Sequence, residues 1–180
     1  MNFILLLPII WAGIGLSMDA FSLAILYGTV GLTRHKAILL SLIVGIFHFF
    51  MPLLGYYFGK TLLTLISINS SVLIGIIFVI ISIQMFLSLT KDEEVMPLTS
   101  LTSFLIFAFT VSIDSFSIGI GLSTLNSSIY LSSLVFAVLS AFFTLVGLTL
   151  GKKLSKIFGN ISILIGSIIL LLLGVYYFFT

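Results

Sequence analysis

Six long apolar stretches occupy most of this 180-residue chain, and short polar segments separate them. A helix that crosses a bilayer needs about 20 consecutive apolar residues. The stretches are predicted as transmembrane helices at 3–28, 37–58, 71–89, 101–123, 129–150 and 161–179. No segment between them is long enough for a soluble domain. The sequence therefore predicts an all-α integral membrane protein with six transmembrane helices.

The charge content excludes most other classes of protein. Only 7% of the residues are charged, whereas soluble domains carry about 25%. A soluble enzyme and a nucleic-acid-binding protein are both excluded. The absence of cysteine excludes disulfides, thiolate metal sites and cysteine nucleophiles. The first apolar stretch lacks a basic leader and contains Asp19, so we do not expect a cleaved signal peptide.

The basic residues predict the orientation in the membrane, because Lys and Arg collect in cytoplasmic loops. With the N-terminus outside, the only basic residue on the outer side is Lys60. The cytoplasmic side then receives Arg34, Lys36, Lys91, Lys152, Lys153 and Lys156. We therefore expect a multi-pass protein of the plasma membrane with both termini outside, and a cytoplasmic linker at 91–98.

The chain contains an internal repeat. Ser17-Met18-Asp19-Ala20-Phe21-Ser22 matches Ser112-Ile113-Asp114-Ser115-Phe116-Ser117 at an offset of 95 residues. In the next helices Phe50, Gly55, Gly59 and Lys60 match Phe142, Gly147, Gly151 and Lys152. In the third helices Ile74-Gly75 matches Ile165-Gly166.

The repeat divides the chain into two three-helix units, 1–90 and 99–180. Three is an odd number of crossings, so the second unit is expected to cross the membrane in the opposite sense to the first. Inverted repeats are a recurring transporter architecture, with the substrate site near the midplane where the repeats meet. Ancestral duplication without surviving function is the alternative.

Asp19 and Asp114 are the acidic residues within the predicted spans. A carboxylate at a helix centre costs about 2.5–3.5 kcal/mol on insertion scales, so the pair costs about 5–7 kcal/mol if nothing compensates it. A purely structural role as hydrogen-bond acceptors between helices is the alternative. A buried Ser or Asn would serve that role at lower cost, which favours an ion-binding site.

Small and polar residues accompany both carboxylates. Ser22 and Ser117 follow the aspartates at i+3, and Thr110 precedes Asp114 at i−4, so they share the carboxylate faces of their helices. The supporting polar set is Ser17, Ser22, Thr110, Ser112, Ser115 and Ser117. The residues expected to allow close helix approach, unwinding or a kink are Gly15, Gly119, Gly121 and Pro52. Small-residue packing is the alternative for each of them.

His48 lies near the middle of the second predicted helix, and its repeat mate is Ser140. The imidazole is a candidate metal ligand or proton acceptor, with helix packing as the alternative. Pro52 is expected to kink this helix and to leave a carbonyl near His48 without its donor. Gln84, in the third predicted helix, is a weaker candidate, and a helix–helix hydrogen bond is the favoured role for it.

Two carboxylates, hydroxyls and an imidazole suit hard or borderline divalent ions such as Mg²⁺, Ca²⁺ and Mn²⁺. After the ion leaves, two bare carboxylates repel each other, and protonation relieves this repulsion. A proton-coupled exchange of the ion is therefore expected. The ion is the transported substrate, the lipid bilayer is the other partner, and neither a cofactor nor an enzymatic activity is expected. A homo-oligomer is compatible with these residues.

The paired Asp19 and Asp114 motifs resemble those of the MntP-type manganese efflux pumps, bacterial membrane proteins similar in fold to the lysine exporter superfamily. The resemblance covers the whole chain, including Pro52-Leu53-Leu54-Gly55. It implies export of Mn²⁺ from the cytoplasm, with both aspartates on the ion path. Members of the family often carry an acidic residue where this chain has His48. That difference bears on which metal is transported, and it could mark a subgroup that includes sporulation-associated relatives.

Three other functions are alternatives. A non-transporting scaffold or sporulation-associated protein would tolerate Asn at both Asp19 and Asp114. An intramembrane aspartyl protease also places one Asp on each of two helices, but it needs a Gly-rich motif directly before one of them. An amino-acid exporter would need a cation at depth for the substrate carboxylate, and no predicted span has a central Lys or Arg.

Overall fold

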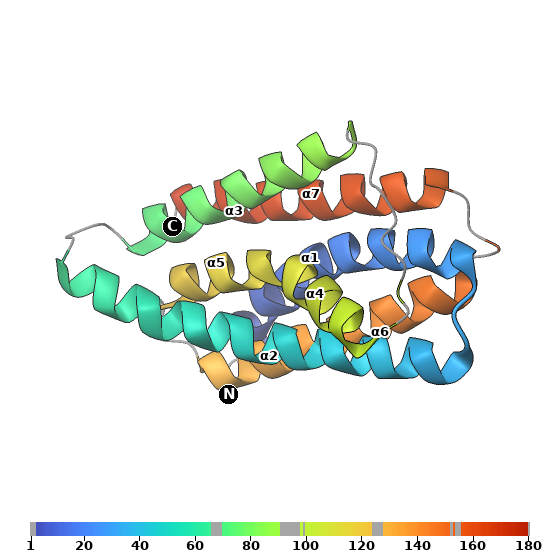
Figure 1. Cartoon of the computed structure of the whole chain (residues 1–180). Coiled ribbons are helices and arrows are strands. Elements are labelled where there is room, and N and C mark those ends of the chain that lie inside the picture. Colours follow the sequence, from blue (N-terminus) through green and yellow to red (C-terminus); the bar gives the residue numbers. More distant parts are fainter. Residues whose placement is uncertain are drawn as a thin grey trace.

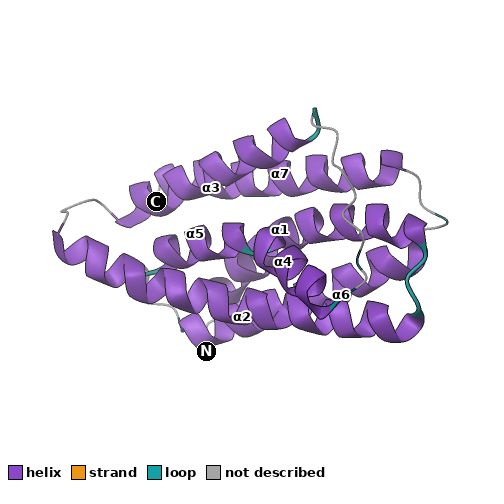
Figure 2. Cartoon of the chain, in the orientation of Figure 1, coloured by secondary structure: helices purple, strands orange, loops and turns teal. Residues whose placement is uncertain are grey.

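The computed structural model describes residues 3–65, 70–90, 98, 100–123, 128–151, 153 and 156–179. Every regular element in this part of the chain is a helix (Figure 2). In chain order the helices are α1 (Phe3–Val30), α2 (Arg34–Leu65), α3 (Ser70–Ser88), α4 (Leu101–Val111), α5 (Ile113–Leu122), α6 (Ile129–Leu150) and α7 (Lys156–Phe178). The expected linker at 91–98 lies, apart from Leu98, outside the described residues.

The helices are long and apolar enough for a multi-pass membrane protein. Within the described ranges, five helices could each cross a membrane by length and composition, or six spans result if the bent pair α4–α5 is one of them. Large apolar side chains cover the outside, including Val138 at 60% and Leu172 at 65% exposure. Such a surface suits lipid rather than water.

The helices form three layers (Figure 1). Helices α3 and α7 pack against each other on one side, α2 and α6 on the other, and α1 lies with α4 and α5 between them. Helices α1, α3 and α6 run toward one end of the molecule, whereas α2, α4–α5 and α7 run toward the other. The two chain ends lie at the same end.

The close helix packing runs between the two halves of the sequence. Among the described residues, α1 packs on α6 and α7, α2 on α4, α5 and α6, and α3 on α5 and α7. The only close pair within one half is α4 with α5, which are consecutive. Residues before 90 therefore pack mainly against residues after 100.

Two glycines bring neighbouring backbones into contact. A Cβ atom at Gly147 would lie 2.8 Å from the Phe21 carbonyl oxygen and 3.1 Å from the Ile25 nitrogen. A Cβ atom at Gly55 would collide with the Phe116 carbonyl oxygen and lie 3.1 Å from the Ile120 nitrogen. Only glycine allows the helix pairs α1–α6 and α2–α5 to approach this closely.

Valine at Gly55 or at Gly147 is expected to separate these helix pairs, because backbone atoms occupy the space the side chain needs. Overpacking of this kind costs about 1–3 kcal/mol or more. Thermal unfolding of the purified protein in detergent measures the loss. Val138→Leu, on the exposed surface, is the control, and an unchanged melting temperature in both glycine variants would contradict the packing described here.

Two predicted helix ranges differ most from the structure, and the others agree to within five residues at each end. The predicted helix 101–123 is broken at Ser112, with a 40° bend between α4 and α5. Helix α2 is longer than the predicted 37–58 and continues through Pro52. Helix α2 continues past Lys60 to Leu65. The Lys60 side chain is exposed, and its ammonium lies 4.7 Å from the centre of the Tyr56 ring. A lysine near a span end can reach the interface in this way.

Candidate functional site: a pocket with two carboxylates

Ser112 ends α4 through hydrogen bonds to its own preceding turn. Its hydroxyl donates to the Ala108 carbonyl at 2.7 Å, and its backbone N–H donates to the Phe109 carbonyl at 3.2 Å. The i−3 bond replaces the usual i−4 bond, and ψ of Ser112 is 3°. Helix α5 therefore starts in a new direction at Ile113.

The break places Asp114 in the first turn of α5. Its Oδ1 accepts hydrogen bonds from the Ser115 backbone N–H at 2.6 Å and from the Ser115 hydroxyl at 3.4 Å. Its Oδ2 is buried and has no partner among the described residues. A helix N-terminus stabilises negative charge, so the break supports a carboxylate at this depth and leaves one of its oxygens available.

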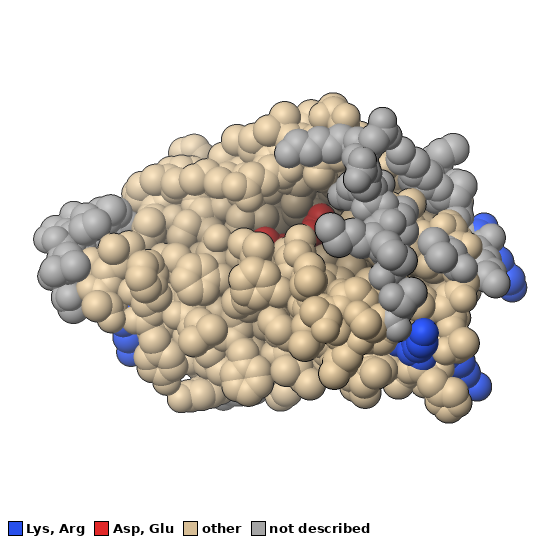
Figure 3. All heavy atoms as spheres, viewed as in Figure 1, with Lys and Arg blue, Asp and Glu red and all other residues tan. Residues whose placement is uncertain are grey.

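Asp19 and Asp114 line one pocket of about 360 Å³, although they come from different helices, α1 and α5. Both side chains are half-buried, and their carboxyl groups are close enough to interact electrostatically. The space-filling view has acidic atoms in a hollow on one face, whereas Lys and Arg appear near the two ends (Figure 3). The hollow thus combines two acidic groups within an apolar surface.

The remaining walls come from α1, α3, α4 and the start of α5. The polar or sulfur-containing members are Gln84, Met85, Ser88 and Thr110. Leu23, Ile81, Val111 and Ile113 are the other lining residues, and none of the described lining residues is Lys or Arg. A pocket with two carboxylates and no basic group attracts cations and repels carboxylate substrates.

His48 lies outside this pocket. It is fully buried in α2, one ring nitrogen, Nδ1, lies 3.0 Å from the Val44 carbonyl oxygen, and Nε2 has no partner among the described residues. The contacts of Pro52 with Gly119 and of Gly55 with Phe116 set the register of α2 beside α5. This register places His48 of α2 at the same level along the helices as the break between α4 and α5.

The structure brings two of the three candidate metal ligands into one pocket. Among the described residues, no group of three or more His, Cys, Asp or Glu is close enough to hold a metal ion. Asp19 and Asp114 share the pocket and His48 does not. A role for His48 as a ligand stays a prediction.

Of the six supporting polar residues, Thr110 lines the pocket, and its hydroxyl donates to the Ile106 carbonyl at 2.9 Å. Ser115 holds Asp114, and Ser112 makes the helix break. Ser17 bonds to the Gly13 carbonyl and lies 3.3 Å from the Ser140 hydroxyl, at the α1–α6 contact.

The other two serines are not part of the pocket lining. Ser22 faces α7, where a Cβ at Gly159 would lie 3.0 Å from its hydroxyl oxygen. Ser117 is half-buried in α5. Their i+3 spacing from the aspartates therefore does not bring their hydroxyls into the pocket.

The predicted small residues and Pro52 are helix contacts. Gly15 lies against Leu170 and Gly166 of α7, and Gly121 lies against Ile74 of α3. Gly119 lies directly against the Pro52 backbone. The expected helix break occurs at Ser112 and not at any of these glycines.

Met85 and Ser88 line the site without having been predicted from the sequence, and Gln84 was a weaker candidate. Gln84 was expected to bond another helix, but it is exposed to the pocket and bonds no other described residue. The available signal was the spacing of Ile81, Gln84, Met85 and Ser88, which lie at i, i+3, i+4 and i+7 on one helix face.

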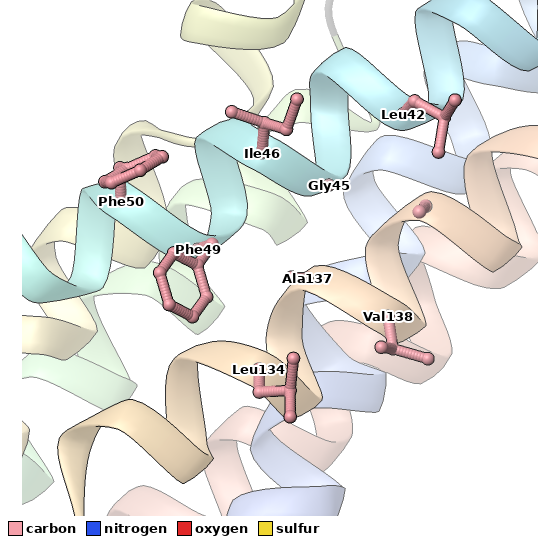
Figure 4. A pocket seen from close by; sticks show the side chains of 9 residues that line it. Leu42, Gly45, Ile46, Phe49, Phe50, Leu134, Ala137 and Val138 are labelled. Carbon is pink, nitrogen blue, oxygen red and sulfur yellow. The ribbon is translucent and has the colours of Figure 1, made fainter.

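A second hollow, of about 370 Å³, lies between α2 and α6 and has an entirely apolar lining. The close-up shows aliphatic and aromatic side chains, including Phe49, Leu134 and Val138, around it (Figure 4). Its wall residues Ile46 and Phe50 are 54% and 56% exposed, so the hollow opens on the apolar outer surface. It offers no ligand for an ion.

The fold and the pocket together define a multi-pass membrane protein with two carboxylates in one pocket beside a broken helix. The profile of the family described as "Putative manganese efflux pump" matches residues 31–178, and the chain belongs to this family.

Relatives named "Putative manganese efflux pump MntP" match most of the chain. The relative from Bacillus pumilus is 34% identical over 161 residues, covering 89% of this chain and 88% of the relative. That from Methanosphaera stadtmanae is 33% identical over 176 residues, covering 94% and 96%. That from Bacillus mycoides is 32% identical over 179 residues, covering 97% and 96%. No solved structure matches the chain significantly.

Proposed function

We propose that this protein exports a divalent metal ion, Mn²⁺ in particular, from the cytoplasm, and that it is a transporter and not an enzyme. The observation that carries the proposal is the single pocket lined by Asp19 and Asp114. Two carboxylates neutralise a divalent ion and so lower the cost of its passage through the bilayer. The names of the relatives support Mn²⁺ as the ion and efflux as the direction.

We propose that the two halves are inverted repeats. Gly55 and Gly147 are repeat mates, and so are Phe116 with Phe21 and Ile120 with Ile25. Gly55 contacts Phe116 and Ile120, while Gly147 contacts Phe21 and Ile25. The opposite directions of α1 and α4–α5, and of α2 and α6, support the same relation.

The two halves pack unequally around the carboxylates. Met18, beside Asp19, is 8% exposed, and a Cβ at Gly166 of α7 would lie 2.7 Å from its Cβ. Its repeat mate Ile113, beside Asp114, is 49% exposed and lines the pocket. Helix α7 therefore covers α1 closely, whereas α3 leaves the start of α5 open.

This difference in packing suggests how access to the pocket could alternate between the two sides of the membrane. Alternating access in inverted-repeat transporters is largely rocking of one bundle against another around a fixed site. We infer that the packed pair α3–α7 rocks as a unit: α3 closes on α5 while α7 separates from α1. The aspartates would then face the opposite side of the membrane.

The pocket opens toward the end proposed to be cytoplasmic. Ser88, the last residue of α3, lines it, and α3 ends on the same side as α2 begins, at Arg34. Basic residues mark the cytoplasmic side, and on this basis we propose that the pocket loads ion from the cytoplasm. Both termini would then lie outside. Protons are proposed to replace the ion on the aspartates after its release.

Inside-out membrane vesicles test the function, because export appears in them as uptake. Vesicles containing the protein are expected to take up Mn²⁺ in preference to Mg²⁺, Zn²⁺ and Co²⁺. Uptake is expected to be faster when the lumen is acidic than when the pH is equal on both sides of the membrane. Vesicles from cells without the protein are the control. Equal metal uptake in both preparations would refute transport, and uptake that ignores an imposed pH gradient would refute proton exchange alone.

A further inference from the structure

One face of α3 presents three potential metal donors to the carboxylate pocket. Ile81, Gln84, Met85 and Ser88 line it together, and they carry an amide, a thioether and a hydroxyl besides one apolar side chain. Elsewhere on α3, Ile80, Ile83, Phe86 and Leu87 are exposed on the apolar surface. Gln84, Met85 and Ser88 therefore line the pocket, whereas Ser82 of the same helix donates its hydroxyl hydrogen to the Ser167 carbonyl of α7.

Gln84 is the neutral oxygen donor of the pocket whose side chain makes the fewest hydrogen bonds, because the Ser88 and Thr110 hydroxyls both donate to backbone carbonyls. Its side chain is exposed to the pocket, and it forms no hydrogen bond to another described residue. An amide within a membrane-spanning helix is costly unless its polar atoms are paired. A cation between Asp19 and Asp114 would provide the partner that its carbonyl oxygen lacks.

Met85 adds a softer donor to the pocket lining that contains Asp19. It is 5% exposed, and its methyl group lies near Gly166, where Met18 also packs. Ser88, which lines the same wall, donates its hydroxyl hydrogen to the Met85 carbonyl at 2.6 Å. Thioether sulfur is a softer donor than oxygen, and Mg²⁺ and Ca²⁺ are hard ions that take oxygen ligands.

We propose that this face of α3 is the selectivity wall of the ion site, with Gln84 as an oxygen ligand and Met85 as the residue that discriminates against Mg²⁺ and Ca²⁺. The inference rests on the proposed transport of a divalent ion. Two carboxylates alone bind Mg²⁺ as well as Mn²⁺, so discrimination needs a donor of a different kind. In the described pocket lining, Met85 is the one sulfur-containing side chain.

The test is Mn²⁺ uptake by inside-out vesicles at increasing Mn²⁺, with and without competing Mg²⁺, for the wild type, Met85→Leu and Gln84→Leu. Met85→Leu keeps the volume and removes only the sulfur, so uptake without Mg²⁺ is expected to persist while Mg²⁺ inhibits at about tenfold lower concentration. Gln84→Leu is expected to raise the half-saturating Mn²⁺ concentration about tenfold with little change in maximal rate.

Two further variants make the result specific. Gln84→Glu retains an oxygen donor and is expected to keep the wild-type half-saturation or to lower it. Ile80→Leu, on the exposed face of α3, is the matched control and is expected to behave as wild type. Amounts of inserted protein are equalised by immunoblot, and Mn²⁺ binding to purified protein in detergent provides a readout besides transport.

The outcomes separate the two proposals. If wild-type vesicles and wild-type protein neither transport nor bind Mn²⁺, the proposed function fails. If the wild type transports Mn²⁺ but Met85→Leu and Gln84→Leu match it in half-saturation and Mg²⁺ inhibition, only the selectivity wall is refuted. Loss of discrimination in Ile80→Leu as well would also refute it, because the effect would not belong to the pocket face.

Discussion

Uptake of Mn²⁺ is expected to fall about a hundredfold or more in both Asp19→Asn and Asp114→Asn. Each change keeps the shape of the side chain and removes one of the two charges in the pocket. At an effective dielectric constant of about 20, two unit charges separated by 4 Å interact by about 4 kcal/mol. A change of about 1.4 kcal/mol corresponds to a tenfold change in binding. The measurement is initial uptake into inside-out vesicles.

The same variants are expected to insert into the membrane at least as well as wild type, because a neutral amide is less costly in the bilayer than a carboxylate. Asp92→Asn is the charge-matched control, since Asp92 lies in the polar segment between the third and fourth apolar stretches. Wild-type uptake in both Asn variants would show that the carboxylates serve only helix packing, as a scaffold protein requires.

A covalent bridge between α1 and α7 is expected to stop transport. The chain contains no cysteine, so a pair introduced as Ser22→Cys and Gly159→Cys is the only thiol pair present. A Cβ at Gly159 would lie 3.0 Å from the Ser22 hydroxyl oxygen and 3.9 Å from its Cα, within reach of a disulfide. If the α3–α7 pair rocks away from α1, oxidation should reduce Mn²⁺ uptake to background and reductant should restore it.

The matched pair is Ser82→Cys with Ser167→Cys, inside the α3–α7 unit. There the Ser82 hydroxyl donates to the Ser167 carbonyl at 2.7 Å. A bridge at this position joins two helices proposed to move together, so uptake is expected to persist after oxidation. Mass spectrometry or mercury titration establishes that each bridge has formed. Full uptake with the Ser22–Gly159 bridge closed would contradict the rocking proposal.

The membrane class and the pairing of Asp19 with Asp114 could be predicted from the sequence, for physical reasons. Long apolar stretches have few alternatives to spanning helices, because backbone polar groups must be satisfied within the bilayer. Charged residues in such stretches are costly, so they indicate function. The family resemblance was confirmed by a profile match over residues 31–178.

The break at Ser112 and the α3 wall could not be predicted in the same way. A serine inside a helix can bond its own preceding turn without ending the helix, and Thr110, for example, does so at Ile106. That α4 stops at Ser112 follows from the backbone there, which has ψ of 3° and an i−3 hydrogen bond, and the residue type alone does not determine this conformation. Gln84 and Met85 have no repeat mates of their kind, so a comparison of the two halves passed over them.

The packing between the two halves has a consequence for how the protein is made. Within the described residues, α1, α2 and α3 have close partners only after residue 100. Helices insert in chain order during synthesis, so these three enter the bilayer before any of their partners exists. At that stage Asp19 lacks the part of the pocket lining that α4 and α5 provide. We therefore expect the native helix packing to form late in synthesis. It requires α6 and α7, which pack on α1, α2 and α3.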